Sequence, residues 1–93
     1  MNNVIWKYKL ELTDRQTIVV PIDWKVLDVQ IQAGLCMWVL VDLGSSAQVP
    51  VEIAVIGTGN HWNADGWIYA GTVQQMPFVW HVFYRVKQNQ EGE

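Results

Sequence analysis

Apolar and polar residues alternate along most of this 93-residue chain, and this period of two limits the fold more than any other feature. In residues 6–12, for example, Trp6, Tyr8, Leu10 and Leu12 alternate with charged residues. Such alternation is typical of a strand with one buried and one exposed face. No segment shows the spacing of a long amphipathic helix. The pattern therefore predicts a fold built almost wholly from strands.

Turn-forming residues divide the alternating segments into candidate strands. The clearest hairpin is predicted at Ala33-Gly34, because glycine readily takes a positive φ. The predicted strands span residues 6–12, 16–20, 25–32, 35–42, 49–56, 67–74 and 78–86. Residues 35–42 are the most continuously apolar and form the candidate central strand.

Strands joined by short connections indicate an antiparallel all-β domain. We expect a small antiparallel β-sandwich or a partly open barrel of six to seven strands. Residues 1–87 are predicted to form this single domain, and residues 88–93 a polar C-terminal tail.

Charge and composition disfavour several classes of protein. Lys and Arg number 6 against 9 Asp and Glu, and no basic stripe suits a nucleic acid polymer. No apolar run approaches the roughly 20 residues that span a bilayer, and the N-terminus lacks the pattern of a secretory signal. Cys36, the only cysteine, cannot form an internal disulfide. We therefore expect a soluble intracellular protein without nucleic acid polymer or membrane partners.

The longest irregular segment, residues 57–66, is the first candidate site. Its candidate ligand-binding residues are Gly57, Thr58, Gly59, Asn60, His61 and Trp62. Glycines could bring main-chain N–H groups close to an anion, because they carry no Cβ. The amide and imidazole add donors, and the indole offers a face on which a base could stack. The alternative is an ordinary connection that uses glycines to turn.

Residues 79–85 are the second candidate. Alternation places Trp80, Val82 and Tyr84 on one face and His81 and Arg85 on the other. A histidine and an arginine two steps apart could hold a phosphate or carboxylate. The alternative is a partly exposed face on which the histidine is simply hydrogen-bonded.

We expect no metal, no cofactor and no catalysis. The histidines, cysteine and carboxylates show no metal-ligand spacing. Cys36 lies in an apolar strand, where a buried and inert thiol is usual. Ser45 and Ser46 lack the sequence of a nucleophile elbow, and no paired carboxylates suggest acid–base chemistry.

Tryptophan is unusually frequent, with six residues in the chain. Those within predicted strands, expected to pack in the core, are Trp6, Trp38 and Trp80. Those at loops or strand ends are Trp24, Trp62 and Trp67. Half-exposed rings at such positions favour binding or oligomer contacts and could also stack on sugars. For each of these three, the alternative is packing at the rim of a small core.

Several short segments, taken together, resemble a known family. In order, they are Ile5-Trp6-Lys7-Tyr8, Gln16-Thr17-Ile18, Val29-Gln30-Ile31-Gln32, Trp38-Val39-Leu40-Val41-Asp42, Ile56-Gly57-Thr58-Gly59, Tyr69-Ala70-Gly71-Thr72-Val73-Gln74 and Val79-Trp80-His81-Val82-Phe83. The set resembles a family of small phage-encoded proteins of uncharacterised function. That family carries histidine directly after Gly-Thr-Gly, whereas here Asn60 precedes His61.

A phage origin favours a protein that acts by binding. Some phage proteins are oligomeric sponges for nucleotide-derived immune signals, and this chain is similar to them in size and in its glycine-rich loop beside aromatic residues. We therefore expect a noncatalytic anti-defence protein that sequesters a small anionic nucleotide-like ligand in the cytoplasm of the infected bacterial host. Exposed sheet edges favour a homo-oligomer.

In this interpretation Trp62 and Trp67 stack on the base, the glycine amides of the loop meet phosphate, and His81 and Arg85 add charge. One alternative is a phage accessory or structural protein that binds a host or virion protein through exposed tryptophans. Another is a small hydrolase or lyase acting on a nucleotide, which the missing catalytic groups disfavour.

Overall fold

The computed structural model describes residues 2–87, and these form seven strands without a helix. The strands are β1 (Asn3–Lys9), β2 (Arg15–Pro21), β3 (Trp24–Ile31), β4 (Leu35–Asp42), β5 (Gln48–Gly57), β6 (Ile68–Gln75) and β7 (Phe78–Val86). Within the described part of the chain, then, nothing has the form of a helix that could cross a membrane.

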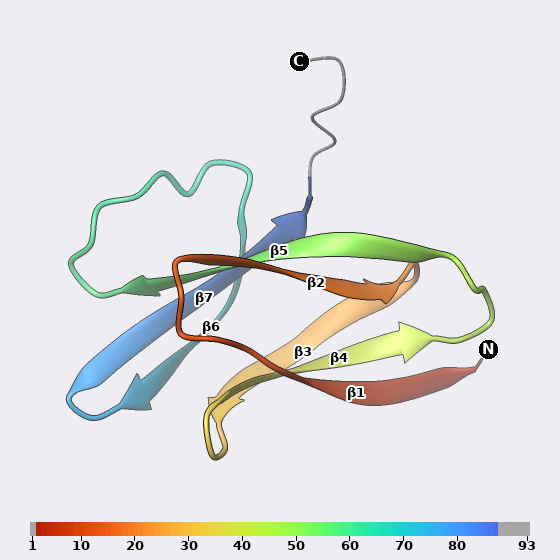
Figure 1. Ribbon diagram of the computed structural model, residues 1–93, viewed down its shortest axis with the longest axis horizontal. Coiled ribbons are helices and arrows are strands. Elements are labelled where there is room, and N and C mark those ends of the chain that lie inside the picture. The colour runs from red at the N-terminus through yellow and green to blue at the C-terminus, as the bar shows by residue number, and fades with distance from the viewer. Residues whose placement is uncertain (1, 88–93) are drawn as a thin grey trace.

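The strands form two antiparallel sheets that lie one above the other (Figure 1). One sheet has the order β1-β4-β3 and the other the order β2-β5-β7-β6. The Cα positions extend only 17 Å along the shortest axis, as expected for two layers roughly 10 Å apart. The sheets do not close into a barrel, and the predicted antiparallel all-β fold is confirmed.

The hydrophobic core lies between the two sheets. On the central strand β4 the inward residues are Leu35, Met37, Val39 and Val41, all almost fully buried. On β5 they are Val51, Ile53 and Val55. Alternate residues of both strands face inward because successive side chains of a strand point to opposite faces. The apolar run of residues 35–42 therefore belongs, as predicted, to the middle strand of its sheet.

The predicted strand boundaries agree with the observed ones to within a residue, except in β1. Residues 6–12 are the predicted first strand, whereas β1 is Asn3–Lys9. The length of the partner strand β4 explains the difference. Pairing runs from Asn3 opposite Asp42 to Lys9 opposite Cys36, and β4 begins one residue before Cys36. Beyond that point Leu10 makes one further bond to Leu35, and the ladder ends.

The hairpin between β3 and β4 is confirmed, and its geometry goes beyond the sequence prediction. Both Ala33 (φ 52°) and Gly34 (φ 124°) have positive φ. The N–H of Gln32 donates to the carbonyl of Gly34 at 2.7 Å. Between β6 and β7, the turn contains a cis peptide bond between Met76 and Pro77.

The tryptophans divide differently from the prediction. Trp24 packs against the core, with its ring edge-on to Tyr84 at 5.5 Å between centroids. The rim-packing alternative therefore holds for this residue. Trp80 also packs against the core, as predicted. The core prediction is wrong for Trp6 and Trp38, because Trp6 is 37% exposed at the edge strand and the register places Trp38 on the outer face beside Lys7.

Tyr8 joins the two sheets through its hydroxyl group. The side chain packs against the core, and the hydroxyl donates to the carbonyl of Val19 on β2 at 3.1 Å. Burial raises the pKa of the Tyr8 phenol above its ordinary value. Above about pH 10 the unfolded chain releases this proton, whereas the folded chain retains it. The contribution of Tyr8 to stability is therefore present below that pH and lost as the pH rises through the raised pKa.

We expect the Tyr8→Phe variant to be less stable by about 1 kcal/mol near neutral pH, because it lacks the bond between the sheets. The difference from the wild type should shrink above about pH 10, since the variant has no phenol to ionise at this position. The difference in the free energy of unfolding is measured by urea unfolding, followed by tryptophan fluorescence, near neutral pH and above about pH 10. A difference that stays constant with pH would contradict the prediction.

Candidate functional site

The long connection between β5 and β6, residues 58–67, begins with a tight turn. The N–H of Asn60 donates to the carbonyl of Gly57 at 3.1 Å, and the N–H of Thr58 donates to Val79 on β7. Gly59 has φ 93°, in the region that favours glycine. The connection lies at the same end of the molecule as the β6–β7 turn (Figure 1). The start of this candidate loop is therefore tied to the sheet.

Aromatic rings attach the rest of the loop to the outer face of the four-stranded sheet. The Trp62 ring lies 4.8 Å from that of Phe83 and 5.4 Å from that of Trp67. Tyr69 on β6 adds a further contact to Phe83 at 5.5 Å. The sequence-predicted binding rings Trp62 and Trp67 are thus brought together, and both are half-buried.

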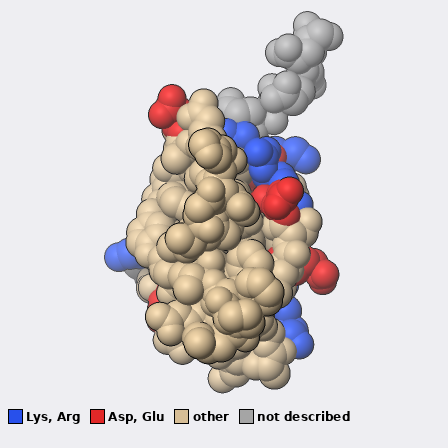
Figure 2. All heavy atoms as spheres, turned by 90° about the vertical axis from the view of Figure 1, so that its left-hand side faces the viewer, with Lys and Arg blue, Asp and Glu red and all other residues tan. Residues whose placement is uncertain are grey.

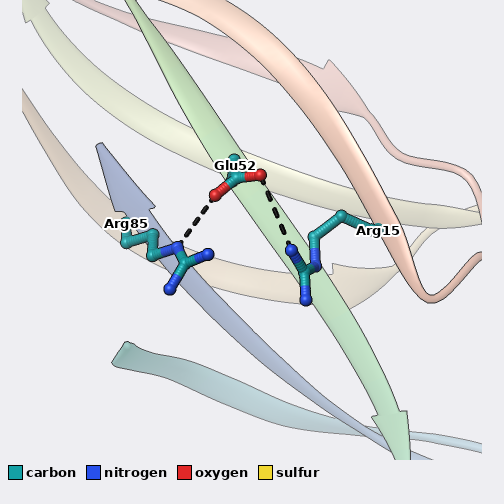
Figure 3. A network of polar contacts seen from close by, with 3 residues as sticks. All are labelled: Arg15, Glu52 and Arg85. Carbon is teal, nitrogen blue, oxygen red and sulfur yellow. Dashed lines mark hydrogen bonds and ion pairs between the residues drawn. The ribbon is translucent and has the colours of Figure 1, made fainter. Parts of the chain in front are cut away.

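Arg85 and Arg15 share the carboxylate of Glu52 (Figure 3). The Arg85 Nε lies 2.8 Å from Glu52 Oε1, and the Arg15 Nη1 lies 3.6 Å from Oε2. Both guanidinium groups also lie over the ring of Trp67, at 4.1 Å for Arg85 and 4.9 Å for Arg15. Two cations on one carboxylate leave one net positive charge. Arg85 makes the shorter contact with Glu52, and its side chain is the less exposed of the two.

His81 lies at the centre of a chain of hydroxyl groups. Its Nε2 is 2.7 Å from Thr58 Oγ1, and its Nδ1 is 2.9 Å from Thr72 Oγ1. Thr72 in turn contacts the hydroxyl of Tyr69. Because a neutral imidazole has one donor and one acceptor, two hydroxyl groups can satisfy both nitrogens. This arrangement matches the alternative given for the second candidate site, in which His81 is simply hydrogen-bonded.

Most of the predicted ligand-binding residues line one small cavity of about 220 Å³. Those that line it are Gly57, Thr58, Gly59, Asn60, Trp62 and His81, together with Ile56 and Phe83. Three predicted residues lie elsewhere. His61 faces a neighbouring cleft, and Trp67 and Arg85 lie with Glu52. His81 and Arg85 therefore do not converge on a common cavity.

A larger cleft of about 440 Å³ lies where β2 begins beside β5, and we call it the β2–β5 cleft. It is lined by Asp14, Arg15, Ala54, Val55, Ile56, Asn60, His61 and Trp62. Asp14 and Arg15 are charged residues that the sequence prediction missed. The register that pairs Arg15 with Ala54 brings them beside the loop. This pairing joins the second strand to the fifth, so no short-range pattern could have revealed it.

The main chain of Val55 borders the β2–β5 cleft. Its side chain belongs to the core cluster, so the backbone is the part that faces the cleft. The pairing of β2 with β5 ends at Arg15 and Ala54. The Pro50 carbonyl accepts a hydrogen bond from the N–H of Lys87 and so points toward β7. Alternation along β5 then turns the Val55 carbonyl toward the β2 side, where the cleft lies.

The end of the molecule that carries this loop is poor in charge. Figure 2 views this end, and uncharged residues cover most of it, with charged side chains near the margins. Within residues 2–87, no three His, Cys, Asp or Glu side chains gather as a metal site requires. The arrangement offers stacking faces, neutral donors and a few charges.

The chain belongs to a family described as a domain of unknown function, DUF7352, whose match covers residues 1–93. The resemblance to an uncharacterised family is thereby confirmed. No curated protein and no solved structure was found to match the chain.

Proposed function

We propose that this chain is a noncatalytic protein that binds a small nucleotide-derived ligand in the β2–β5 cleft. The observation that carries the proposal is the meeting of three chemically different groups in that cleft. They are Trp62, Arg15 and Asp14, which contribute an aromatic, a basic and an acidic residue to its lining. The volume of about 440 Å³ lies in the range of small-molecule sites.

Each part of a nucleotide has a partner among these groups. The base stacks on Trp62, and its exocyclic amino group donates to the Val55 carbonyl. Asp14 accepts hydrogen bonds from ribose hydroxyls, as acidic residues do in dinucleotide sites. Arg15 is half-exposed and only loosely paired with Glu52, so it is the cation that can meet phosphate. Asn60 and His61 add donors at the rim.

The resemblance to phage-encoded proteins supports the biological setting. We place the protein in the cytoplasm of an infected bacterial host, where it captures a nucleotide-derived immune signal and so blocks defence. Capture lowers the free concentration of the signal by mass action and needs no turnover. Free edges such as that of β1 support a homo-oligomer as the working form.

The test is a thermal-shift and equilibrium-dialysis series with adenosine monophosphate, ADP-ribose and a cyclic dinucleotide. We expect at least one of them to raise the melting temperature, by an amount that grows with the logarithm of its concentration once this exceeds the Kd. Arg15→Gln and Trp62→Ala should each weaken binding roughly tenfold, through loss of a charged contact and of a stacking face. Chromatography after incubation should return the ligand unchanged.

Lys25→Gln is the matched control, because it removes one exposed positive charge from the other sheet and should leave affinity unchanged. Recovery of every nucleotide unbound, with no thermal shift, would contradict the proposed function. Recovery of a chemically altered ligand would show instead that the protein is an enzyme.

A further inference from the structure

We propose a second binding site, for a neutral sugar, in a pocket beside the β6–β7 turn. This Phe78 pocket has a volume of about 440 Å³ and is lined by Gly57, Thr58, Asn60, Pro77, Phe78, Val79 and Trp80. It lies apart from Arg15 and Trp62, and Asn60 alone lines both it and the β2–β5 cleft. Apart from this shared residue, the inference does not depend on the nucleotide proposal.

The wall of the Phe78 pocket is an aromatic platform. The rings of Phe78 and Trp80 are nearly parallel, at 27° with centroids 5.4 Å apart. Phe78 is 54% exposed, so its ring faces solvent although it lies on a strand. Trp80 is held from below by the core, and its indole N–H donates to Gln75 Oε1 at 3.3 Å. The inner ring of the platform is thus held in place before any ligand arrives.

A neutral hydrogen-bonding group stands directly beside this platform. A Cβ placed on Gly57 would lie 3.2 Å from Asn60 Nδ2 and 3.4 Å from Trp80 Cζ3. The missing side chain at Gly57 therefore lets the amide and the indole come close together. Asn60 is exposed and lines the pocket, so its amide group can reach a ligand there.

These features fit the two kinds of surface that a pyranose ring presents. The C–H face of a sugar is apolar and stacks on an aromatic ring, while its hydroxyl groups bond amides at the edge. Every residue that lines the pocket is uncharged, and Figure 2 shows an uncharged surface over most of this end. A neutral sugar leaves no ion unpaired there, whereas a charged one would. A proline-rich peptide would need a longer aromatic groove than this single pair of rings supplies.

The experiment is a titration of the ¹⁵N-labelled chain with cellotriose, maltotriose and tri-N-acetylchitotriose, followed by NMR. We expect at least one of these to shift the indole signal of Trp80 at millimolar concentration. Phe78→Ala should weaken that binding about tenfold or more, because the outer stacking ring is lost. Phe78→Tyr keeps the ring and should bind nearly as the wild type does. Asn60→Ala should weaken binding several-fold, since it removes the amide.

Met76→Ala is the matched control, because Met76 is 84% exposed in the same turn and does not line the pocket. It should leave the titration unchanged, as should Arg15→Gln, which tests the other site. The proposal is overturned if no neutral sugar shifts the Trp80 signal, or if Phe78→Ala binds as the wild type does. It is also overturned if trigalacturonate or a proline-rich peptide binds more tightly than every neutral sugar.

Discussion

Replacing Gly71 with alanine is expected to lower the free energy of unfolding by about 1–3 kcal/mol. A Cβ built on Gly71 would lie 2.6 Å from Cγ2 of Val29, well inside the contact distance of two carbon atoms. Gly71 lies on β6 beside a register shift, and Val29 lies on β3, where the two sheets come together. Val29 is 3% exposed and β-branched, so its side chain has little room to turn away. The two strands must then separate to admit one methyl group.

A double-mutant cycle separates this clash from other effects of the substitution. Val29→Ala alone should cost about 1–2 kcal/mol through lost burial. In the Gly71→Ala background the same change removes the clashing methyl groups, so it should cost much less or stabilise the protein. Urea unfolding of the four proteins measures the coupling. Strictly additive losses would contradict the proposed contact between Gly71 and Val29.

Much of the strand pattern could be predicted from the sequence because alternation is a local property. Residues 78–86 place Trp80, Val82 and Tyr84 on one face, and the structure buries that face against the other sheet. Residues 35–42 are the most continuously apolar segment, and they form β4, the middle strand of its sheet. In residues 78–86 the period of two and the burial of the strand point to the same answer.

What the sequence could not supply was the pairing of distant strands. The start of β1 depends on how far β4 extends, since Asn3 pairs with Asp42. Arg15 reaches the candidate site only because β2 pairs with β5. Arg85 was expected to be free for a ligand, yet β5 places Glu52 directly opposite it. Each of these facts follows from contacts between residues far apart along the chain.

Glu52→Gln is expected to lower the free energy of unfolding by about 1–3 kcal/mol and to loosen the loop that carries Trp62. The Glu52 side chain is 13% exposed and is the shared partner of Arg15 and Arg85. Glutamine keeps the shape but removes the charge, so two guanidinium groups remain beside Trp67 without a carboxylate between them. Like charges at short range repel, and the aromatic cluster should separate from the sheet.

Two readouts distinguish this mechanism from a general loss of stability. Near-ultraviolet circular dichroism should lose tryptophan intensity, and a protease should cut residues 58–67 faster than in the wild type. Arg85→Gln should be more damaging than Arg15→Gln, because its bond to Glu52 is 2.8 Å rather than 3.6 Å and its side chain is less exposed. Glu11→Gln is the control, since this exposed carboxylate should contribute within about 0.5 kcal/mol. Equal losses for Glu11→Gln and Glu52→Gln, or an unchanged tryptophan signal in Glu52→Gln, would show that the shared carboxylate does not hold the loop.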